Sequence, residues 1–567
     1  MFATVIQSLV YLCVPAIAFA CSREKTVLFI PLDERFTTRD IVLNLKDVMN
    51  DFCMITPEPS LLSLWKTPAP IDELHAWVDE NMGKAKTAII SAEMYLYGSL
   101  INSRTSNDTT AEITGRVHQL LDVSKKYGTD LYISTVVMRI PSYNGDFEEP
   151  WYWTDYGADI YSYSFYTDQS EKTGSVEAFE TAMSYKKKVP ADALEEFLWR
   201  RERNHNVTLE LIDILKEREK DDGTPNFFQY LYITLDDSAE YGFNIQEADE
   251  IKSLVDKLDK KLQERIPVYP GSDETQMILL SKFATLAKSD SDNINHSARV
   301  RVGVVYRDPL TNDKIPNYEG EAMALTLKMN IEAGGGELVE VMDVNDAHAD
   351  EVDLFLFVNN FSTDKQLEAS QQPPFDGNVF DSDSDDDTGY DDYQRFDAFI
   401  AKYLDKKALG FCDNKYSNGA DLRFVAYIST KVAQSKLQTI AYAGWNTNSN
   451  TIGTVVANSI ILSLFGNSHD AQVGNARFNS IRLVEDAGYQ ADTRLSLIQY
   501  LTSLSSEVYP NENTMDLNPD LQYYTHFSFK QLASTYYRIA QTYGLPYELE
   551  SIYYPWNRTF ESGFYIS

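Results

Sequence analysis

The stretch "LYITLDDSAEYG", residues 231–242, decides the fold, because a β-branched and aromatic run ends there on two adjacent carboxylates. Successive side chains of an extended strand point to opposite faces, so Asp236 and Asp237 can share one site only if the strand has already ended. The pair therefore predicts the edge of a sheet, where α/β folds place their chemistry. The alternative is a solvated loop or the start of a helix, where carboxylates are also favoured.

The chain around this stretch alternates short β-branched runs with amphipathic helices, the pattern of a sheet covered by crossover helices. Before residue 299 this pattern predicts five strands, at 26–34, 87–93, 130–139, 230–237 and 266–274. The third strand finishes on Arg139 and the others finish on acids, which are Asp33 with Glu34, Glu93, Asp236 with Asp237, and Asp273 with Glu274. Acids that converge from separate strand ends are typical of a barrel active site. We therefore expect residues 21–298 to form a (β/α) barrel-like domain.

A second block of strands is predicted at 300–308, 337–343, 352–360, 408–414 and 439–447. It is either a separate domain or the far half of one large barrel, and the spacing leaves both open. The two blocks together overfill the eight strands of a single barrel, which favours two domains. The predicted fold class is α/β: a (β/α) barrel-like N-terminal domain, a flavodoxin/Rossmann-like α/β domain over 299–470, and a mostly helical C-terminal segment over 471–567.

An acidic run interrupts the second block, with eight aspartates between Asp376 and Asp392. Its first aspartates alternate with other residues as in a calcium loop, but Asp386 stands where such a loop requires glycine. We therefore predict that residues 376–392 form a solvated, disordered insertion.

The first twenty residues form an uncharged apolar run that ends in Ala-Phe-Ala, the pattern of a signal-peptidase site. We interpret residues 1–20 as a cleaved signal peptide, and no later segment has the roughly 18 unbroken apolar residues of a membrane span. A secreted or extracellular protein is expected, and five N-x-[ST] sequons agree with this: Asn107, Asn206, Asn295, Asn360 and Asn557. Three cysteines remain after cleavage, among which Cys21 and Cys53 are the predicted disulfide.

The charge of the chain narrows the class of ligand. A formal net charge of −35 makes nucleic acid or an anionic membrane a poor partner, because phosphate would be repelled. A small neutral substrate such as a glycan fits better. The sequence has no phosphate loop, G-x-S-x-G elbow or H-E-x-x-H motif, and no cofactor is predicted. Carboxylates therefore remain as the candidates for chemistry, and the oligomeric state is left open.

Three aspartates are the candidate catalytic residues. Asp237 is predicted to be a general acid with Asp236 as its partner, since crowding two like charges raises one pKa, as a proton donor near neutral pH requires. Asp273 is a further candidate carboxylate. Its alternative role, shared with Glu274, is to start the helix that follows, whose positive end favours an acid.

Charged residues at the other strand ends are candidates for binding substrate. Asp33, Glu34 and Arg35 either pair with one another or hold sugar hydroxyls. Arg104 and Arg139 are potential partners for the acids.

Two later segments add polar and aromatic candidates. Trp445 either offers its face to a sugar ring or packs in the core, and Asn446 can both donate and accept hydrogen bonds. Asn418 and Asp421 lie in another strand-end loop and are either site or turn residues. The complete predicted substrate-binding set is Asp33, Glu34, Arg35, Glu93, Arg104, Arg139, Glu274, Asn418, Asp421, Trp445 and Asn446.

From about residue 25 to the C-terminus the chain resembles domain-of-unknown-function family 4127, a largely bacterial family also found in fungi. The segments that carry the resemblance are "PLDER" at 31–35, "SAEMYLYGSLINSR" at 91–104, "LDDSAEYG" at 235–242, "GSDE" at 271–274, "SNGAD" at 417–421, "YAGWNTNSNTIGT" at 442–454, "RLVEDAGYQADTR" at 482–494 and "PWNRTFE" at 555–561. The chain departs from the family at Phe36, where proline is usual, and at Glu93, where aspartate is usual. The family name supplies no activity.

The Asp-Asp pair at the end of the fourth expected strand also looks like the site of glycoside hydrolase family 84, the retaining N-acetylglucosaminidases. That resemblance implies that Asp236 orients the acetamido group of the substrate and that Asp237 is the general acid and base.

The sequence thus predicts an exported carbohydrate-active hydrolase, a glycosidase that uses paired carboxylates on a neutral or N-acetylated glycan. One alternative is a hydrolase in which Asp33, Asp236, Asp237 and Asp273 hold Mg²⁺ or Ca²⁺. The other is a non-catalytic glycan-binding protein of the cell surface.

Overall fold

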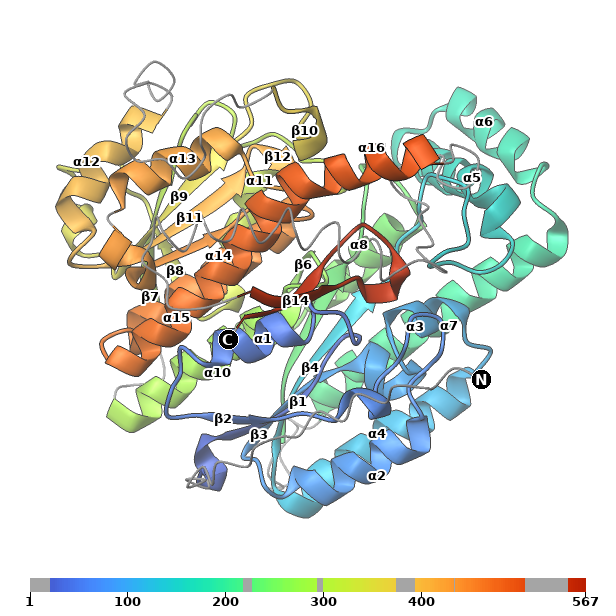
Figure 1. Cartoon of the computed structure of the whole chain (residues 1–567). Coiled ribbons are helices and arrows are strands. Elements are labelled where there is room, and N and C mark those ends of the chain that lie inside the picture. The colour runs from blue at the N-terminus through green and yellow to red at the C-terminus, as the bar shows by residue number, and fades with distance from the viewer. Residues whose placement is uncertain are drawn as a thin grey trace, which may run out of the picture.

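The computed structural model describes residues 21–217, 227–292, 299–373, 393–432, 434–504 and 549–566. Within them the chain forms two main parallel sheets with helices packed on their faces, as Figure 1 shows. The predicted signal peptide and the acidic insertion at 376–392 lie outside the described residues.

The first sheet has six parallel strands in the order β2-β1-β3-β4-β5-β6. They are β1 (Thr26–Ile30), β2 (Cys53–Ile55), β3 (Thr87–Ser91), β4 (Asp130–Val137), β5 (Phe228–Leu235) and β6 (Val268–Pro270). Strands β1 and β3 are buried along their whole length, as parallel strands covered on both faces should be. The helices of this half are α1 (Asp40–Lys46), α2 (Ile71–Met82), α3 (Leu100–Thr105), α4 (Thr110–Tyr127), α7 (Ala191–Glu217), α8 (Phe243–Val255), α9 (Lys260–Gln263) and α10 (Thr275–Asp292).

The described part of this sheet is open, so the expected barrel-like closure is not found. Each strand pairs only with its neighbours in the order given, and β2 and β6 are the two edges. All five predicted strands are present, and β2 is the one that the sequence did not reveal. The order at its start, 2-1-3-4-5, is that of a doubly wound, flavodoxin-like sheet.

The second sheet has five parallel strands in the order β13-β11-β9-β7-β8, and each lies where the sequence predicts one. They are β7 (Val300–Tyr306), β8 (Gly336–Val339), β9 (Leu354–Asn360), β11 (Ala408–Asn414) and β13 (Ile440–Ala443). Read from β8, this order is again that of a flavodoxin-like sheet. The surrounding helices are α11 (Met323–Ala333), α12 (Gln394–Tyr403), α13 (Leu422–Lys431), α14 (Asn448–Phe465) and α15 (His469–Arg482), and a short pair of strands, β10 (Leu367–Glu368) and β12 (Tyr416–Ser417), lies beside them.

A single hydrophobic cluster joins the two sheets. It contains Phe29 of β1, Leu279 of α10, Leu356 of β9 and Ile460 of α14. Helix α14 is buried over nearly its whole length, and it packs against α10. Because these two helices lie between the sheets, the relative position of the two halves is fixed by apolar packing.

The remaining described elements are a pair of helices on one side of the molecule and the last part of the described chain. Helices α5 (Trp153–Thr173) and α6 (Val176–Lys186) project to one side with their own apolar cluster (Figure 1). Residues 471–504 are helical, as predicted, and end in α16 (Arg494–Leu504). The prediction of a mostly helical C-terminus is wrong for the last described residues, where β14 (Leu549–Tyr553) and β15 (Gly563–Ile566) pair antiparallel. We call residues 549–566 the C-terminal hairpin.

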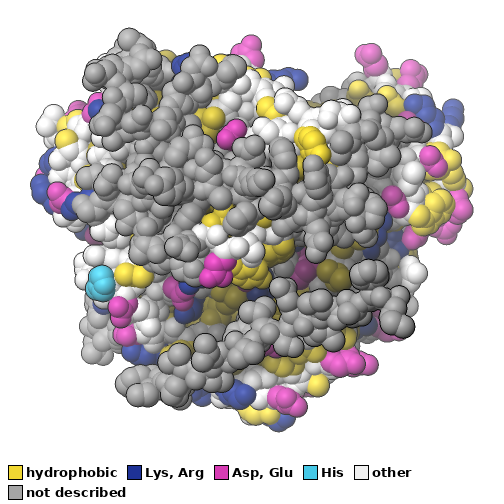
Figure 2. All heavy atoms as spheres, in the orientation of Figure 1, with side chains coloured by type: hydrophobic (Ala, Val, Ile, Leu, Met, Phe, Trp, Pro, Cys, Tyr) yellow, Lys and Arg dark blue, Asp and Glu magenta, His cyan; other side chains and the backbone are white. Residues whose placement is uncertain are grey.

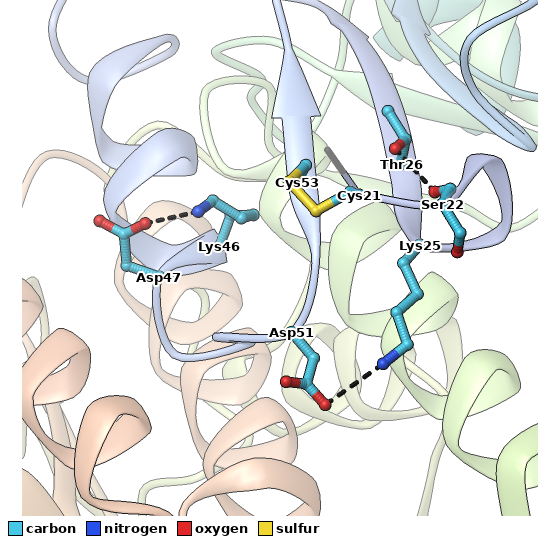
Figure 3. The surroundings of a disulfide bond; sticks show 8 residues. All are labelled: Cys21, Ser22, Lys25, Thr26, Lys46, Asp47, Asp51 and Cys53. Carbon is cyan, nitrogen blue, oxygen red and sulfur yellow. Dashed lines mark hydrogen bonds and ion pairs between the residues drawn. A yellow bond between two sulfur atoms is a disulfide. The ribbon is translucent and has the colours of Figure 1, made fainter. Parts of the chain in front are cut away.

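The predicted disulfide between Cys21 and Cys53 is present and ties the start of the described chain to β2. Figure 3 shows this bridge near an ion pair between Lys25 and Asp51. The third cysteine, Cys412, is buried and free.

The sequons differ in their accessibility. Asn107 and Asn206 are exposed. Asn360 is fully buried, and its amide donates to the Asp308 carbonyl and to Thr311 Oγ1, so it is not available for glycosylation in the folded chain. Asn295 and the side chain of Asn557 lie outside the described residues.

The surface mixes charges of both signs. On the face seen in Figure 2, the described acidic side chains are interspersed with Lys and Arg. Among the described helices, none combines the length and the apolar character needed to cross a membrane.

Candidate functional site

A cavity of about 270 Å³ opens between the two halves of the molecule. Its lining is rich in arginine, carboxylate and amide groups, with several aromatic rings. The lining residues are Arg35, Leu100, Arg104, Arg139, Tyr143, Asn144, Gly145, Phe147, Glu148, Leu235, Asp236, Asp237, Gly271, Ser272, Asp273, Tyr318, Glu319, Glu368, Asn418, Asn446, Thr447, Ser449, Asn450, Arg494, Arg558 and Phe560.

The topology of both sheets explains this position. In a doubly wound sheet, ligands bind outside the carboxyl ends of the strands. The segments that follow β1, β3, β4, β5 and β6 all contribute lining residues, and so do those that follow β7, β12 and β13. The cavity therefore lies where the carboxyl ends of the two sheets face each other.

The Asp236–Asp237 pair lies on this edge. Strand β5 ends at Leu235, one residue before the pair, as the alternation argument requires. The carboxylate of Asp236 accepts from Arg104, and that of Asp237 accepts from Arg139 Nη1 at 2.9 Å. The side chain of Asp237 is 35% exposed, whereas that of Asp236 is 10% exposed. Asp237 is thus the more accessible of the two.

Asp237 is a carboxyl group that retains its proton unusually well. Burial, and then the neighbouring charge of Asp236, raise the pKa of Asp237 to about 6, and Arg139 opposes this shift only in part. A carboxyl group with such a pKa can donate a proton at mildly acidic pH.

Two acids from the loop after β4 bind the arginines together. Glu148 pairs with Arg104 at 3.3 Å and with Arg139 at 3.0 Å, and Glu149 pairs with the same arginines at 3.2 and 2.9 Å. Burial opposes the ionisation of Glu148, but Arg139, then Arg558 and Arg104, hold its pKa well below the usual value. This ion-pair network fixes the guanidinium groups that face Asp236 and Asp237.

On the opposite wall, Arg35 bridges two aspartates. Its guanidinium is 2.8 Å from Asp33 and 2.7 Å from Asp273. The C-terminal hairpin covers it: the indole of Trp556 lies between the guanidinium groups of Arg35 and Arg558, at 4.5 and 4.6 Å from the ring centroid. The chain terminus therefore completes a site whose other walls come from residues far earlier in the sequence.

Backbone strain is concentrated at this cavity. The non-glycine residues with positive φ in the described chain are Trp65, Tyr318, Asn418, Asn446 and Trp556. Tyr318, Asn418 and Asn446 line the cavity. Trp65 and Trp556 both donate to Glu34, the residue before Arg35. Such conformations cost energy and gather where a binding site requires a fixed side-chain position.

The structure brings most of the predicted site residues together. Asp236, Asp237, Asp273, Arg35, Arg104, Arg139, Asn418 and Asn446 line the cavity. Asp33 lies behind Arg35 and holds its guanidinium. Glu34 points away from the cavity and accepts from Ser63 as well as from the two tryptophans.

Three other predicted residues do not reach this cavity. Glu93 is buried beneath the sheet edge and accepts from Ser91, Thr135 and the Val136 amide. Asp421 is the N-cap of α13, one of the helices around the second sheet. Trp445 is 4% exposed and its indole N–H donates to Thr454, so it packs in the core, the second of the two roles predicted for it. It also borders a small void of about 10 Å³ beside the cavity.

Glu274 lies just beneath the cavity floor and is fully buried. It accepts from the Asn450 amide and from the Ser272 N–H at 3.2 Å. Gly271 has a φ of +133°, and a Cβ there would lie 1.9 Å from Glu274 Oε1, so glycine makes room for this carboxyl group. Burial raises the pKa of Glu274 to about 8.

We expect Glu274→Gln to remove a pH-dependent loss of stability. Because the folded chain holds this proton more tightly than the unfolded chain, the free energy of unfolding falls as pH rises from about 4.5 to about 8. Between pH 5 and pH 8 the wild type should lose about 3 kcal/mol relative to the variant. Urea unfolding at both pH values tests this, with the exposed Glu332→Gln as control. Parallel pH profiles for wild type and Glu274→Gln would contradict the expectation.

Several site residues were missed by the sequence analysis: Tyr143, Phe147, Glu148, Glu149, Tyr318, Glu319, Asn450, Arg494, Arg558, Phe560 and Glu561. The adjacent acids Glu148 and Glu149 resemble the Asp-Asp pair and could have been noticed. Asn450 lies in the first turn of α14 and Arg494 at the start of α16. The others lie in long connections or in the C-terminal hairpin, where no strand pattern marks them.

The carboxylates of the alternative metal site are already engaged. Each of Asp33, Asp236, Asp237 and Asp273 pairs with an arginine. Within the described residues, no three His, Cys, Asp or Glu side chains are arranged to hold a metal ion. A cation at these aspartates would have to displace guanidinium groups.

Comparisons with known proteins place the chain in a family without assigning it an activity. No curated protein matches the chain, and no solved structure does. One family model matches residues 27–564, nearly the whole chain. The chain therefore belongs to the family described as "Protein of unknown function (DUF4127)".

Proposed function

We propose that this protein is an exported carbohydrate-active hydrolase that cleaves a glycosidic bond with Asp237 as the proton donor. The observation that carries the proposal is the accessible carboxyl group of Asp237, with a pKa of about 6, in a cavity lined by amides, hydroxyls and aromatic rings. A general acid needs a pKa near the working pH and access to the leaving oxygen.

The rest of the lining supports a sugar as the ligand. Asn144, Asn418 and Asn446 offer amide donors and acceptors for hydroxyl groups. Phe147 and Phe560 add apolar surface to the cavity wall. Polar groups fix a ligand's orientation while apolar walls exclude water, which is the usual composition of a small-molecule site.

The proposed reaction assigns separate roles to the carboxylates. Asp237 protonates the glycosidic oxygen as the bond to the anomeric carbon breaks, and water then adds to the anomeric carbon and gives up a proton to a carboxylate of the site. A carboxylate ion at Asp236 or Asp273 stabilises the positive charge that develops on the sugar, as paired carboxylates do in glycosidases. Asp236 is held by Arg104 and Asp273 by Arg35, so neither needs to reorient during the reaction. The weak similarity to glycoside hydrolase family 84 agrees with Asp237 as the general acid but implies another role for Asp236, the orientation of a substrate acetamido group.

We also propose that residues 21–298 and 299–470 are two domains and that the mature chain acts outside the cell. The two flavodoxin-like strand orders support the first statement. The apolar leader and the disulfide between Cys21 and Cys53 support the second, because such bonds persist in oxidising compartments.

The test is release of chromophore from aryl glycosides, including N-acetylhexosaminides, by the purified mature chain with and without a chelator. We expect turnover of at least one substrate, with the same rate after chelation. Turnover that a chelator abolishes would replace this mechanism with the metal-dependent alternative. Silence across the panel would contradict the proposal for those sugars.

A further inference from the structure

We propose that the glycan bound in this cavity carries an anionic group, a carboxylate or a sulfate, and that Arg494 binds it. The inference rests on the proposed function for the statement that the ligand is a sugar. It adds the chemical class of one substituent and the residue that selects it.

Arg494 differs from the other arginines of the cavity. Arg35, Arg104, Arg139 and Arg558 each pair with at least one carboxylate. Arg494 is 6% exposed and lines the same cavity, yet it forms no ion pair with any Asp or Glu of the described chain.

The contacts that Arg494 does make are neutral. Its Nη1 donates to Gln490 Oε1 at 3.4 Å, and its guanidinium lies over the ring of Phe560, 5.0 Å from the centroid. Its Nε is buried, and no hydrogen-bond partner for it is found among the described residues. These contacts hold the side chain in place while leaving its charge without a counter-charge.

A buried charge without a counter-charge is unfavourable, and a bound anion removes that penalty. The planar fork of a guanidinium matches the oxygens of a carboxylate or a sulfate, which a lysine does not reproduce. Phe560 lies in both the cavity wall and the Arg494 contact, and the guanidinium of Arg558 also lies over its ring, 4.9 Å from the centroid. An anionic substituent at Arg494 would therefore lie beside the aromatic wall of the cavity.

The net charge of −35 limits the ligand to few negative charges. At physiological salt the field of the chain is screened within about 10 Å, so it acts mainly on approach and disfavours polyanions. The charge of Arg494 acts at contact distance inside the cavity. A sugar with one acidic substituent satisfies both conditions.

The experiment is calorimetric titration of the mature chain with matched sugars. The pairs are glucose with glucuronate and galactose with galacturonate; glucose 6-sulfate and inorganic sulfate complete the set. We expect an acidic sugar to bind at least about tenfold more tightly than its neutral counterpart, because the ligand anion is the only member of the pair that can pair with Arg494. Comparing the affinity of the uronates with that of glucose 6-sulfate shows whether the site prefers a carboxylate or a sulfate.

Variants assign the preference to this residue. Arg494→Gln should reduce the preference to less than about twofold, Arg494→Lys should retain part of it, and the exposed control Arg301→Gln should leave it unchanged. Circular dichroism establishes that each variant is folded. The wild-type comparison does not depend on any variant.

Equal binding of acidic and neutral sugars would overturn the inference. Failure of every acidic sugar to bind would overturn it too, and so would a preference that survives in Arg494→Gln. Inorganic sulfate that binds as tightly as the acidic sugars would also overturn it, because the site would then recognise an anion and no sugar. Acidic sugars that bind through Arg494 without turnover of any glycoside would support this inference and contradict the hydrolase. Turnover of neutral glycosides without an anion preference would support the hydrolase and contradict this inference.

Discussion

Asp237→Asn is expected to lower kcat of the proposed glycosidase activity by about 10²- to 10⁴-fold, the range that general acid catalysis supplies. The amide keeps the size of the side chain and its contact with Arg139, but it cannot donate a proton of comparable acidity to the leaving oxygen. Because the pKa of Asp237 is about 6, the proton is lost as pH rises through that value. Wild-type kcat/KM should therefore fall above about pH 6, and the variant should lack this limb.

The measurement is the pH–rate profile of both proteins on an aryl glycoside with a poor leaving group, such as the unsubstituted phenyl glycoside. Asp364→Asn is the matched control, since Asp364 is a fully exposed aspartate that does not line the cavity. It should have the wild-type profile. Wild-type rates in Asp237→Asn, or an unchanged alkaline limb, would remove Asp237 from the proton-donor role.

Arg104→Met should destabilise the fold by about 3 to 5 kcal/mol, the usual cost of removing one partner of a buried ion pair. Arg104 is 1% exposed and pairs with Asp236, Glu148 and Glu149. Without it, Asp236 loses its guanidinium partner in the described chain, whereas Glu148 and Glu149 keep Arg139. Methionine fills a similar volume, so the loss would come mainly from uncompensated carboxylates.

Chemical unfolding at pH 7 measures this loss. Arg301→Met is the control, because Arg301 forms an exposed pair with Asp353 at 3.5 Å and such pairs contribute about 0 to 1 kcal/mol. The difference between the two variants should shrink at low pH, where protonation removes the unpaired negative charges. A loss at Arg104 no greater than that at Arg301 would show that the network contributes little to stability.

The strands could be predicted from the sequence because parallel strands buried on both faces leave continuous apolar runs, as in β1, β3 and β9. Strand β2 was not predicted because it has only three residues, and all of them are half-buried. The order of strands in a sheet depends on pairings between distant segments, which periodicity does not record. This is why four acidic strand ends suggested a barrel, although the described sheet is open.

The candidate site was predictable where its residues follow strands directly. Asp236, Asp237 and Asp273 fit the rule that the carboxyl ends of strands hold the site, and they do meet at one cavity. Glu93 also follows a strand, yet its side chain turns into the core. Arg558 and Phe560 arrive from the C-terminal hairpin, and only tertiary packing places them beside residues hundreds of positions earlier. The local sequence therefore indicated that the site lies at the carboxyl edge of the sheet. It did not indicate which side chains face the cavity.

The most direct test of the proton-donor role compares aryl glycosides whose leaving groups differ in acidity. A phenol that leaves readily as an anion needs no proton, whereas a poor leaving group depends on one. We predict that Asp237→Asn retains most wild-type activity on a dinitrophenyl glycoside and loses it on the unsubstituted phenyl glycoside. An equal loss on both substrates would contradict it, because Asp237 would then act on a step other than protonation of the leaving oxygen.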